Sequence, residues 1–468
     1  MASHTGNPTI DALLTLIQTS AQSAVDEYNK SGFGVPSPDS PSLHPLDSSS
    51  DVLALKKAIR ILEGACERLC TTLAQPMHTI ANRTMPYEAP CLRLAVEKKF
   101  ADVLKGLPGL HVNAIAAKTR LDPKKVSQVL RLLATRGCFK EVSENVFTNN
   151  RLSLMLLSSN PVSATVLLNT NECLKAVTML PEAMQHTDYA FSESVDRTAF
   201  SLSVRGAGQG DRDMSLFEWY KMNPEIGQRF DRAMTGWSRI TGSISVVNNF
   251  PWDTLPQGTT FCDIGSGVGT LTLSLASAHR HLKVVLQDFP EVLVAAKAFW
   301  SAEYPQSIRD QRVDFVPLDF LKERPVAEQD VYYMKHVLHD WPDNDVVCIL
   351  QNVAKAMKPD GTSRLFIHDF VLKHVYSTVK PDSGSDMSIG IERAPEPLLP
   401  NYGTGNIRHY NQDVNMLAMF NSRERTCEEY ATLGEEAGLC LIKVWDLAET
   451  YMLEFKLIGS PIASSEGV

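Results

Sequence analysis

The sequence lacks any apolar run of the 18 or more residues that a membrane-spanning helix needs. Its first residues, MASHTGNPTIDALL, lack the basic-then-apolar pattern of a secretory signal. There is no basic excess either, because the formal net charge is −9 at pH 7, which disfavours nonspecific attraction to nucleic acid and to anionic membranes. We therefore expect a cytoplasmic protein that has neither nucleic acid nor a membrane as its partner.

Cysteine is sparse and shows no pattern. The 9 cysteines are odd in number, include no Cys-x-x-Cys, and form no Cys/His cluster with the spacing of metal ligands. This usage favours free, buried thiols in a reducing compartment over a disulfide framework. We expect neither a catalytic cysteine nor a metal site.

The N-terminal part of the chain is predicted to be largely helical. Apolar residues recur at helical spacing over residues 9–30, where Thr9 is a candidate cap, and again over residues 51–73. Residues 32–50, between these two helices, are dominated by Pro, Ser and Gly, which is typical of a flexible linker. A short helix is expected near residues 89–104.

Residues 110–150 carry a series of short elements. LHVNAIAAKT predicts a short helix, and the stretch that starts at Pro123 and ends just before Gly137 predicts a longer one. CFKEVSENVFTNN alternates apolar and polar residues around a polar turn and predicts a hairpin. Two helices and a hairpin in this order predict a winged-helix unit. Residues 151–240 are expected to be mostly helical.

Strands and helices alternate after Pro251. The apolar segments TTFC, LKVVLQDF, VDFVPLDF, DVYYMKHVL and SRLFIHDFVL predict strands, and a helix over residues 345–357 precedes the last of them. Such alternation predicts an α/β fold with a mainly parallel, doubly wound sheet. Pro, Gly and Ser are enriched over residues 376–408, which predicts a long surface loop.

The strongest local signal is the turn DIGSGVG, residues 263–269, which follows strand TTFC and precedes a helix. A dinucleotide site requires Gly-x-Gly-x-x-Gly, but after Gly265 and Gly267 the third glycine comes one place early. The carboxylate of Asp263 would repel a pyrophosphate and attract a ligand ammonium group. The turn therefore favours S-adenosylmethionine, which carries an ammonium and a sulfonium but no phosphate.

Two further acidic residues end the next predicted strands. Asp288 lies where an acid accepts hydrogen bonds from ribose hydroxyls. The pair Asp319-Phe320 suits an adenine, with a carboxylate for the exocyclic amine and an aromatic face. An Asp at a strand end can also be only a helix cap, and this alternative is strongest at Asp319. Three strands in order, each ending in Asp, favour the ligand site.

A fourth strand leads into KHVLHDWPD, residues 335–343, at the same edge of the sheet. With this segment the chain resembles the plant and fungal small-molecule O-methyltransferases, typified by caffeic acid O-methyltransferase, over roughly residues 90–460. The resemblance rests on DIGSGVGT, LQDFPEV, LHDWPD and the late RERT at residues 423–426. None of these motifs is specific alone, but their combination in this order is.

The resemblance implies a domain organisation. Residues 206–468 would form a Rossmann-like class I methyltransferase domain. Residues 1–50 would form an N-terminal helix and flexible linker, and residues 51–205 a helical, winged-helix dimerisation domain. A homodimer is therefore expected.

The family's functional residues carry over onto matching positions. His339 takes the place of the catalytic base, and Glu424 and Asp369 take those of its acidic partners, although the family commonly has Glu where this chain has Asp369. The positions implied to contact the cofactor are Asp263, Gly265, Gly267, Asp288, Asp319, Phe320 and Lys335. The positions implied to line the acceptor pocket are Met234, Asn415, Met416 and Met419, of which the last two could also be ordinary core.

These residues suit one chemistry. A phenol has a pKa of about 10 and is a poor nucleophile while protonated, and a neutral imidazole can take its proton as the oxygen attacks. The hypothesis is an S-adenosylmethionine-dependent O-methyltransferase for a hydroxyl of a small aromatic molecule, a phenolic or polyketide secondary metabolite. The alternatives are N- or C-methylation on the same fold, a DNA-binding regulator and a cofactor-binding pseudoenzyme. His336 is expected to point away from His339, because successive residues of a strand face opposite sides.

Overall fold

The computed structural model describes residues 5–48, 52–206, 212–242, 244–376 and 392–459. The chain divides into two compact units. Unit 1 comprises Met1–Gly242 and Leu417–Asn421, and unit 2 comprises Ser243–Met416 and Ser422–Val468. The three-domain division expected from the sequence stays a prediction.

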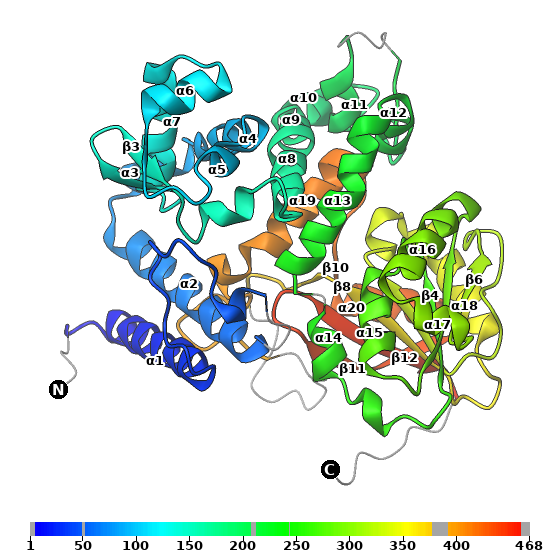
Figure 1. The fold of residues 1–468 in the computed structure, drawn as a ribbon. Coiled ribbons are helices and arrows are strands. Elements are labelled where there is room, and N and C mark those ends of the chain that lie inside the picture. Colours follow the sequence, from blue (N-terminus) through cyan, green and yellow to red (C-terminus); the bar gives the residue numbers. More distant parts are fainter. Residues whose placement is uncertain (1–4, 49–51, 207–211, 243, 377–391, 460–468) are drawn as a thin grey trace. The chain divides into compact units, whose positions relative to one another are not determined.

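Unit 1 begins with two long helices, α1 (Pro8–Lys30) and α2 (Leu53–Leu73), which pack against each other (Figure 1). Asn7, not Thr9, caps α1, because its side-chain oxygen accepts hydrogen bonds from the N–H groups of Thr9 and Ile10. The segment between the helices is anchored at its far end, where Asp47 forms an ion pair with Arg151.

The middle of unit 1 has the helix, helix and hairpin that its sequence predicts. The elements are α3 (Pro76–Arg83), α4 (Glu88–Glu97), α5 (Phe100–Val103), β1 (Leu110–His111), α6 (Val112–Thr119), α7 (Pro123–Thr135), β2 (Lys140–Ser143) and β3 (Val146–Thr148). The strands form an antiparallel sheet in the order β1-β3-β2. Phe100, Leu130 and Phe147 are fully buried and belong to one core that joins these helices to the hairpin.

The rest of unit 1 is helical, as expected. Its elements are η2 (Ser153–Leu156), α8 (Val162–Leu167), the π-helical η3 (Leu168–Cys173), α9 (Leu174–Thr178), α10 (Leu180–Gln185), α11 (Ala199–Val204), α12 (Leu216–Met222) and α13 (Pro224–Ile240). Helix α13 packs on α8. The core between these helices includes Met419, which is 1% exposed.

Unit 2 is an α/β domain. Its elements are α14 (Ser245–Asn249), η4 (Trp252–Thr254), β4 (Thr260–Ile264), α15 (Thr270–Ala278), β5 (Lys283–Asp288), α16 (Pro290–Glu303), α17 (Pro305–Arg309), β6 (Val313–Pro317), β7 (Val331–Lys335), η5 (Leu338–Asp340), α18 (Asp343–Ala356), β8 (Arg364–Asp369), β9 (Val371–Leu372), η6 (Gly403–Asn406), α19 (Ile407–Phe420), β10 (Arg425–Thr426), α20 (Cys427–Glu436), β11 (Leu439–Asp446) and β12 (Tyr451–Leu457). The 7-stranded sheet has the order β11-β12-β8-β7-β4-β5-β6.

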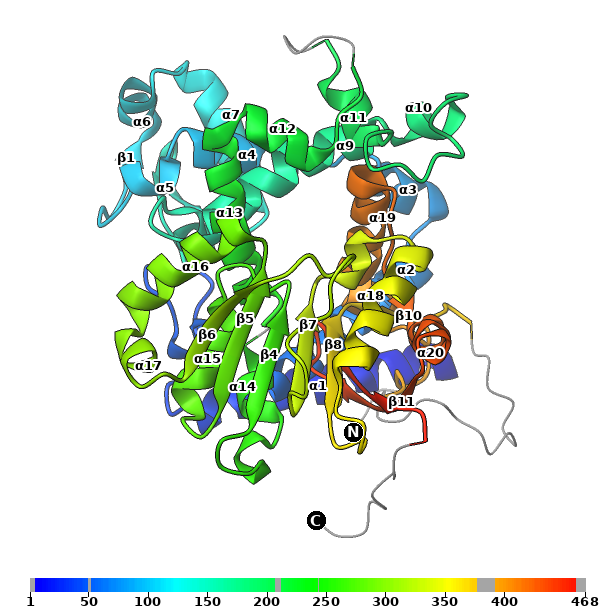
Figure 2. The same ribbon diagram turned by 90° about the vertical axis from the view of Figure 1, so that its right-hand side faces the viewer.

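Most of this sheet is parallel. Strands β4 to β8 pair in parallel, and Figure 2 shows them side by side. Strand β12 pairs antiparallel with both β8 and β11. The α/β, Rossmann-like fold with a helical N-terminal part is confirmed, although the β11–β12 hairpin was not predicted.

Alternate residues of the strands face two separate cores. Phe261, Tyr333 and Phe366 face a core that contains residues of α14, α15 and α16. Their neighbours Cys262 and Tyr332 face a core that contains residues of α18 and α20. Helices therefore cover both faces of the sheet, which leaves the ends of its strands as the place for a ligand.

Strand order reverses at β4, which lies between β5 and β7 although it precedes both in the chain. In open α/β sheets, ligands bind beyond the carboxyl ends of the strands at such a point. The turn that carries Gly265 follows β4 there. The fold thus places the glycine-rich turn at the switch point of the sheet.

The predicted surface loop over 376–408 is described only in part. Residues 377–391 lie outside the described residues. In the remainder, Glu392, Arg393 and Glu396 are exposed, whereas Leu398, Asn401 and Tyr402 are buried, so residues 398–408 do not form a surface loop. The large side chains of this part pack into the fold despite the flanking Pro and Gly residues. Among the described residues no helix combines the length and apolarity that crossing a membrane requires.

Candidate active site

The glycine-rich turn depends on backbone conformations that favour glycine. Gly265 has a φ of +68°, and a Cβ there would lie 2.7 Å from Cγ2 of Val337. Gly269 has a φ of +73°, and a Cβ there would lie 2.7 Å from Cδ1 of Leu286. Around a Cβ on Gly267, in contrast, no atom lies within 4 Å. The turn packs tightly at its two ends and leaves open space in its middle, where a ligand can approach the backbone.

Asp288 at the end of β5 holds this turn. Its Oδ2 accepts a hydrogen bond of 2.8 Å from the N–H of Gly267, and its Oδ1 accepts one of 2.7 Å from its neighbour Phe289. Burial raises the pKa of Asp288, and the two N–H donors oppose that shift. The sequence predicted Asp288 as a ligand contact, and the structure shows that it also links the turn to the next strand.

Asp263 lies beneath the turn. Only 5% of the residue is exposed, and its Oδ2 accepts a hydrogen bond from the hydroxyl of Thr272, a partner that the sequence did not suggest. Burial raises the pKa of Asp263 to about 7, against the opposing effects of Thr272 and of the charge on Lys335. Burial also lowers the pKa of Lys335 to about 8, although the charges of Asp369 and Asp263 act in the other direction.

Asp319 and Phe320 have different surroundings. The carboxylate of Asp319 accepts hydrogen bonds from the N–H of Leu321 and from the ammonium of Lys322, as a loop-capping residue does. The ring of Phe320 lies close to the turn, 3.7 Å from the position of a Cβ on Gly265. The aromatic residue of the pair is therefore beside the turn, and the carboxylate is engaged by its own loop.

His339 lies in η5, just beyond the end of β7, and is 6% exposed. Its Nδ1 is 2.8 Å from Oε1 of Glu424, which is 1% exposed. Its Nε2 is 3.7 Å from Oδ1 of Asp340. Glu424 directly precedes β10, which pairs with β9 next to the end of β8. The pairing of these two short strands brings together residues that are 85 positions apart in the chain.

Electrostatic interactions favour a proton on this pair. Burial disfavours the imidazolium form, but the negative charges of Glu424 and Asp340 outweigh it and raise the pKa of His339 to about 10. Burial also raises the pKa of Glu424, while His339 acts in the opposite direction. A proton is therefore held strongly between the two side chains.

A second set of contacts fixes the segment that carries Glu424. The guanidinium of Arg425 is fully buried and donates to the carbonyl oxygens of Leu338 and Trp341, at 2.8 and 2.7 Å. The hydroxyl of Ser422 donates to the carbonyl oxygen of His339. The resemblance gave a role to Glu424 alone, yet Ser422 and Arg425 also hold the backbone around His339 in place.

Asp369 has other partners than the ring of His339. Its Oδ1 accepts a hydrogen bond of 2.8 Å from the backbone N–H of His336, and its Oδ2 accepts one of 3.0 Å from the hydroxyl of Tyr430. Among the described residues it makes no hydrogen bond to His339. Its charge still reaches that ring, where it contributes to the raised pKa.

The expected orientation of His336 is wrong. Its ring stacks on that of His339, with centroids 5.3 Å apart and an interplanar angle of 17°, and it also stacks with Phe370 at 5.5 Å. The reason is that β7 ends at Lys335 and His336 has a φ of +53°, so the alternation of a strand does not extend this far. Burial lowers the pKa of His336 well below its usual value.

The four predicted acceptor residues belong to both units. Asn415 and Met416 lie in the part of α19 that belongs to unit 2, and the Asn415 Oδ1 is buried without a hydrogen-bond partner among the described residues. Met419 lies in the core of unit 1, and Met234 of α13 is 36% exposed. Their joint role as a pocket stays a prediction.

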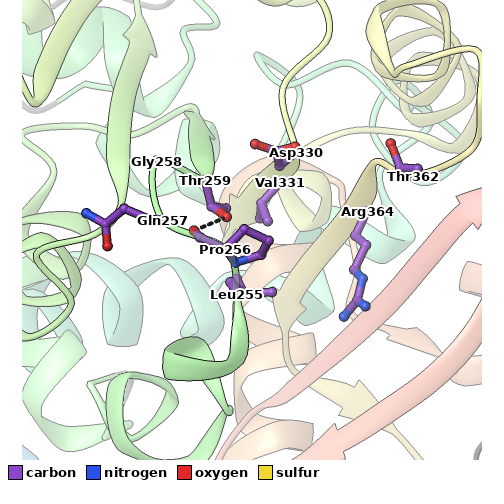
Figure 3. Close-up of a pocket in the computed structure, with 9 residues that line it drawn as sticks. All are labelled: Leu255, Pro256, Gln257, Gly258, Thr259, Asp330, Val331, Thr362 and Arg364. Carbon is purple, nitrogen blue, oxygen red and sulfur yellow. Dashed lines mark hydrogen bonds between the residues drawn. The ribbon is translucent and has the colours of Figure 1, made fainter.

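A surface pocket lies at the opposite edge of the sheet. Figure 3 shows its lining, which includes Thr259 before β4, Asp330 before β7 and Arg364 at the start of β8. It encloses about 290 Å³. No residue predicted for the cofactor or acceptor site lines it, so it is separate from the candidate active site.

Comparison with known proteins identifies the family. The family model described as an O-methyltransferase domain matches residues 204–394. The "3-O-methyltransferase 2" of Phanerochaete chrysosporium is 39% identical over 450 residues, which cover 95% of this chain and 97% of that protein. The chain belongs to the O-methyltransferase family. This O-methyltransferase uses S-adenosylmethionine as its cofactor.

Other relatives agree. The O-methyltransferase gedA of Aspergillus terreus is 30% identical to this O-methyltransferase over 430 residues, which cover 84% of each chain. The solved structure of the mitomycin 7-O-methyltransferase MmcR matches 82% of this chain and 98% of its own, with a TM-score of 0.62 and 23% identity. That structural likeness shows the shared fold.

Proposed function

We propose that this O-methyltransferase methylates a phenolic hydroxyl of a small aromatic secondary metabolite and that His339 is the general base. The observation that carries the proposal is the buried hydrogen bond of 2.8 Å between His339 Nδ1 and Glu424 Oε1. A carboxylate on Nδ1 fixes the tautomer, so that Nε2 has the lone pair that receives a proton. The name of the relative from Phanerochaete chrysosporium, a 3-O-methyltransferase, supports a hydroxyl acceptor.

The base must be deprotonated to act, and the surrounding carboxylates oppose this. The raised pKa of His339 means that the free enzyme holds its proton at neutral pH. When bound, S-adenosylmethionine supplies an electrophilic methyl group and the positive charge of a sulfonium. The positive charge of a bound cofactor would counteract Glu424 and Asp340 and would favour the neutral imidazole of His339. The acceptor's oxygen then transfers its proton to Nε2, and Glu424 stabilises the imidazolium that forms.

The residues of the turn fit this cofactor. Gly265 lets the turn pack against Val337, and Gly267 exposes backbone to a ligand. Asp288 retains free lone pairs for hydroxyl donors, and Phe320 offers an aromatic surface beside the turn. Asp263 lies in β4 just before the turn, and Lys335 ends the neighbouring strand β7, from where its charge acts on Asp263. Of the proposed cofactor contacts Asp319 has the weakest support, because its own loop engages its carboxylate.

Two further roles are part of the proposal. Asp369 acts as a positioning residue. It accepts hydrogen bonds from the backbone N–H of His336 and from the hydroxyl of Tyr430, and not from the ring of His339. Met234, Asn415, Met416 and Met419 are proposed to contact the acceptor, as the family resemblance implies.

The enzyme is proposed to be a cytoplasmic homodimer that assembles through its helical, winged-helix part. Large apolar side chains at the end of α2 and around α3 are each at least 60% exposed, namely Leu73, Met77, Ile80, Met85 and Tyr87. Such a patch is typical of an interface between protein chains. None of the cysteines that the structure describes is in a disulfide, which suits a reducing compartment. Sedimentation that detects only monomer at micromolar concentration would refute the dimer.

The function is tested by transfer of a labelled methyl group from S-adenosylmethionine to a panel of phenols. We expect product that carries the label on oxygen, together with loss of turnover in His339→Ala at neutral pH. Transfer to amines or to carbon alone would contradict the proposal.

A further inference from the structure

A cluster of metal-binding side chains lies at the amino ends of the strands, outside the proposed active site. Asp253 belongs to η4 before β4, while His279 and His281 lie between α15 and β5. A carboxylate oxygen of Asp253 and one ring nitrogen of each histidine lie within 4.8 Å of one another. We propose that these three residues form a zinc-binding site.

Backbone carbonyls orient both rings as ligands. The Nε2 of His279 is 2.9 Å from the carbonyl oxygen of Val247, and the Nε2 of His281 is 3.1 Å from that of Trp252. A carbonyl only accepts hydrogen bonds, so Nε2 carries the proton in each ring and Nδ1 keeps its lone pair in the neutral form. Histidines that bind metals almost always donate their other N–H to a carbonyl or carboxylate in this way.

The contact between His279 and Asp253 also suits a shared ion. Nδ1 of His279 is 2.8 Å from Oδ1 of Asp253, and Val247 already takes the proton on Nε2. A hydrogen bond at Nδ1 would therefore need a second proton on the ring. A zinc ion replaces that proton, and two ligands on one tetrahedral zinc lie about 3.4 Å apart, given zinc–ligand distances of about 2.1 Å.

A second set of residues provides a contrast. His336, His339 and Asp369 also have ligand atoms within 4.8 Å of one another, but the two rings are stacked with an interplanar angle of 17°. A metal lies in the plane of each imidazole that binds it, and nearly parallel, stacked planes do not meet at one ion. The rings of His279 and His281 are inclined at 86°, with centroids 6.1 Å apart, so their planes can meet.

The ligand set and position define the role. Two imidazoles, one carboxylate and a fourth position open to water match the preferences of Zn²⁺. The ion would join η4, which precedes β4, to the turn before β5. It would thus link the segments that lead into these two neighbouring strands. Because the three residues are brought together by folding, zinc would bind the folded chain and raise its midpoint of thermal unfolding.

The test uses the full-length chain, freed of metal with a chelator that is then removed. We expect calorimetric titration with Zn²⁺ alone to detect one site of micromolar affinity. His281→Ala and Asp253→Asn should each weaken it at least tenfold. The side chain of Asp253 is 84% exposed, so its substitution leaves the fold intact. Asp310→Asn, a change at another exposed Asp, is the matched control and should bind zinc as the parent chain does.

A second readout separates a site from scattered surface binding. Co²⁺ in place of Zn²⁺ should give the visible absorption of a four-coordinate nitrogen and oxygen site, and zinc should raise the unfolding midpoint of the parent chain but not of His281→Ala. The proposal is overturned if the parent chain binds no zinc at micromolar concentration. It is equally overturned if both variants bind zinc like the parent, because the ion is then adventitious.

Discussion

The two edges of the sheet in unit 2 differ in how far their ionisable side chains are exposed to solvent. At the carboxyl ends, Asp263, His339 and Glu424 are each at most 6% exposed and have raised pKa values. At the amino ends, the side chains of Asp253 and Asp330 are 84% and 36% exposed, and Asp330 forms an ion pair with Lys358. Burial of ionisable groups costs folding stability, and buried groups with shifted pKa values are found mainly at functional sites. The contrast supports the proposed placement of the active site at the carboxyl edge.

The largest expected effect comes from removal of the base. General-base removal costs about 10²- to 10⁴-fold in rate, so His339→Ala should lower kcat by that order while cofactor affinity stays nearly constant. Steady-state kinetics with the preferred phenol at neutral pH measures the first, and calorimetry with S-adenosylhomocysteine the second. A rise of pH toward the pKa of the phenol should partly rescue the variant.

His336→Phe is the matched control for this variant. It removes an imidazole of the same stack but keeps a flat ring against His339. The kcat of His336→Phe should stay at least about tenfold higher than that of His339→Ala, given the range for loss of a general base. If both variants lost turnover equally, the assignment of the base to His339 alone would be wrong.

Glu424→Gln tests the buried pair itself. The charge of Glu424 helps to raise the pKa of His339, so the variant should have a lower pKa at that ring. The base acts only when deprotonated, so the acidic limb of the kcat/KM profile should move to lower pH. The plateau should also fall by at least about tenfold, because the imidazolium loses its stabilising carboxylate. An unchanged acidic limb would show that His339 does not control the profile.

Asp288→Ala should have a smaller effect, on binding. Loss of charged hydrogen bonds costs about 1–3 kcal/mol, and calorimetry should find S-adenosylhomocysteine weakened by that amount. Asp319→Ala is the informative comparison, since its carboxylate is bound by Leu321 and Lys322. An equal loss in both variants would restore Asp319 as a ligand contact.

Local patterns were enough to predict the first part of the sheet and the turn. The Asp residues that end strands and the early third glycine follow from spacing over a few residues. In the structure Gly267 donates a hydrogen bond to Asp288, whose charge also acts on Asp263. The pair of His339 and Glu424 was suggested by the family resemblance alone. The two residues are 85 positions apart, and a pattern over a few residues cannot show that residues so far apart in the chain lie in contact.

The misses have physical causes as well. The alternation rule placed His336 on the wrong side because β7 ends at Lys335, three residues before the end of the predicted strand DVYYMKHVL, and His336 has a positive φ. The hairpin of β11 and β12 was not predicted, although its residues are buried. Its strands follow each other without a helix between them, so the alternation of strands and helices did not indicate them. The sequence did not suggest the proposed zinc ligands, because Asp253 lies 26 residues before His279 in the chain.

The smallest effect expected at the carboxyl edge is a pH dependence of cofactor affinity. Burial raises the pKa of Asp263 to about 7, and a cationic ligand prefers the ionised carboxylate. Below pH 7 a growing fraction of the free enzyme carries a neutral Asp263 and binds less tightly, and above pH 7 this penalty disappears. The affinity for S-adenosylmethionine should therefore fall by up to about tenfold between pH 8 and pH 6, as the protonated fraction of a group with this pKa rises. Calorimetry across this range measures it, and Asp263→Asn should bind more weakly but with little dependence on pH. An equally steep dependence in Asp263→Asn would assign the proton to another group, such as Lys335 or the His339 and Glu424 pair.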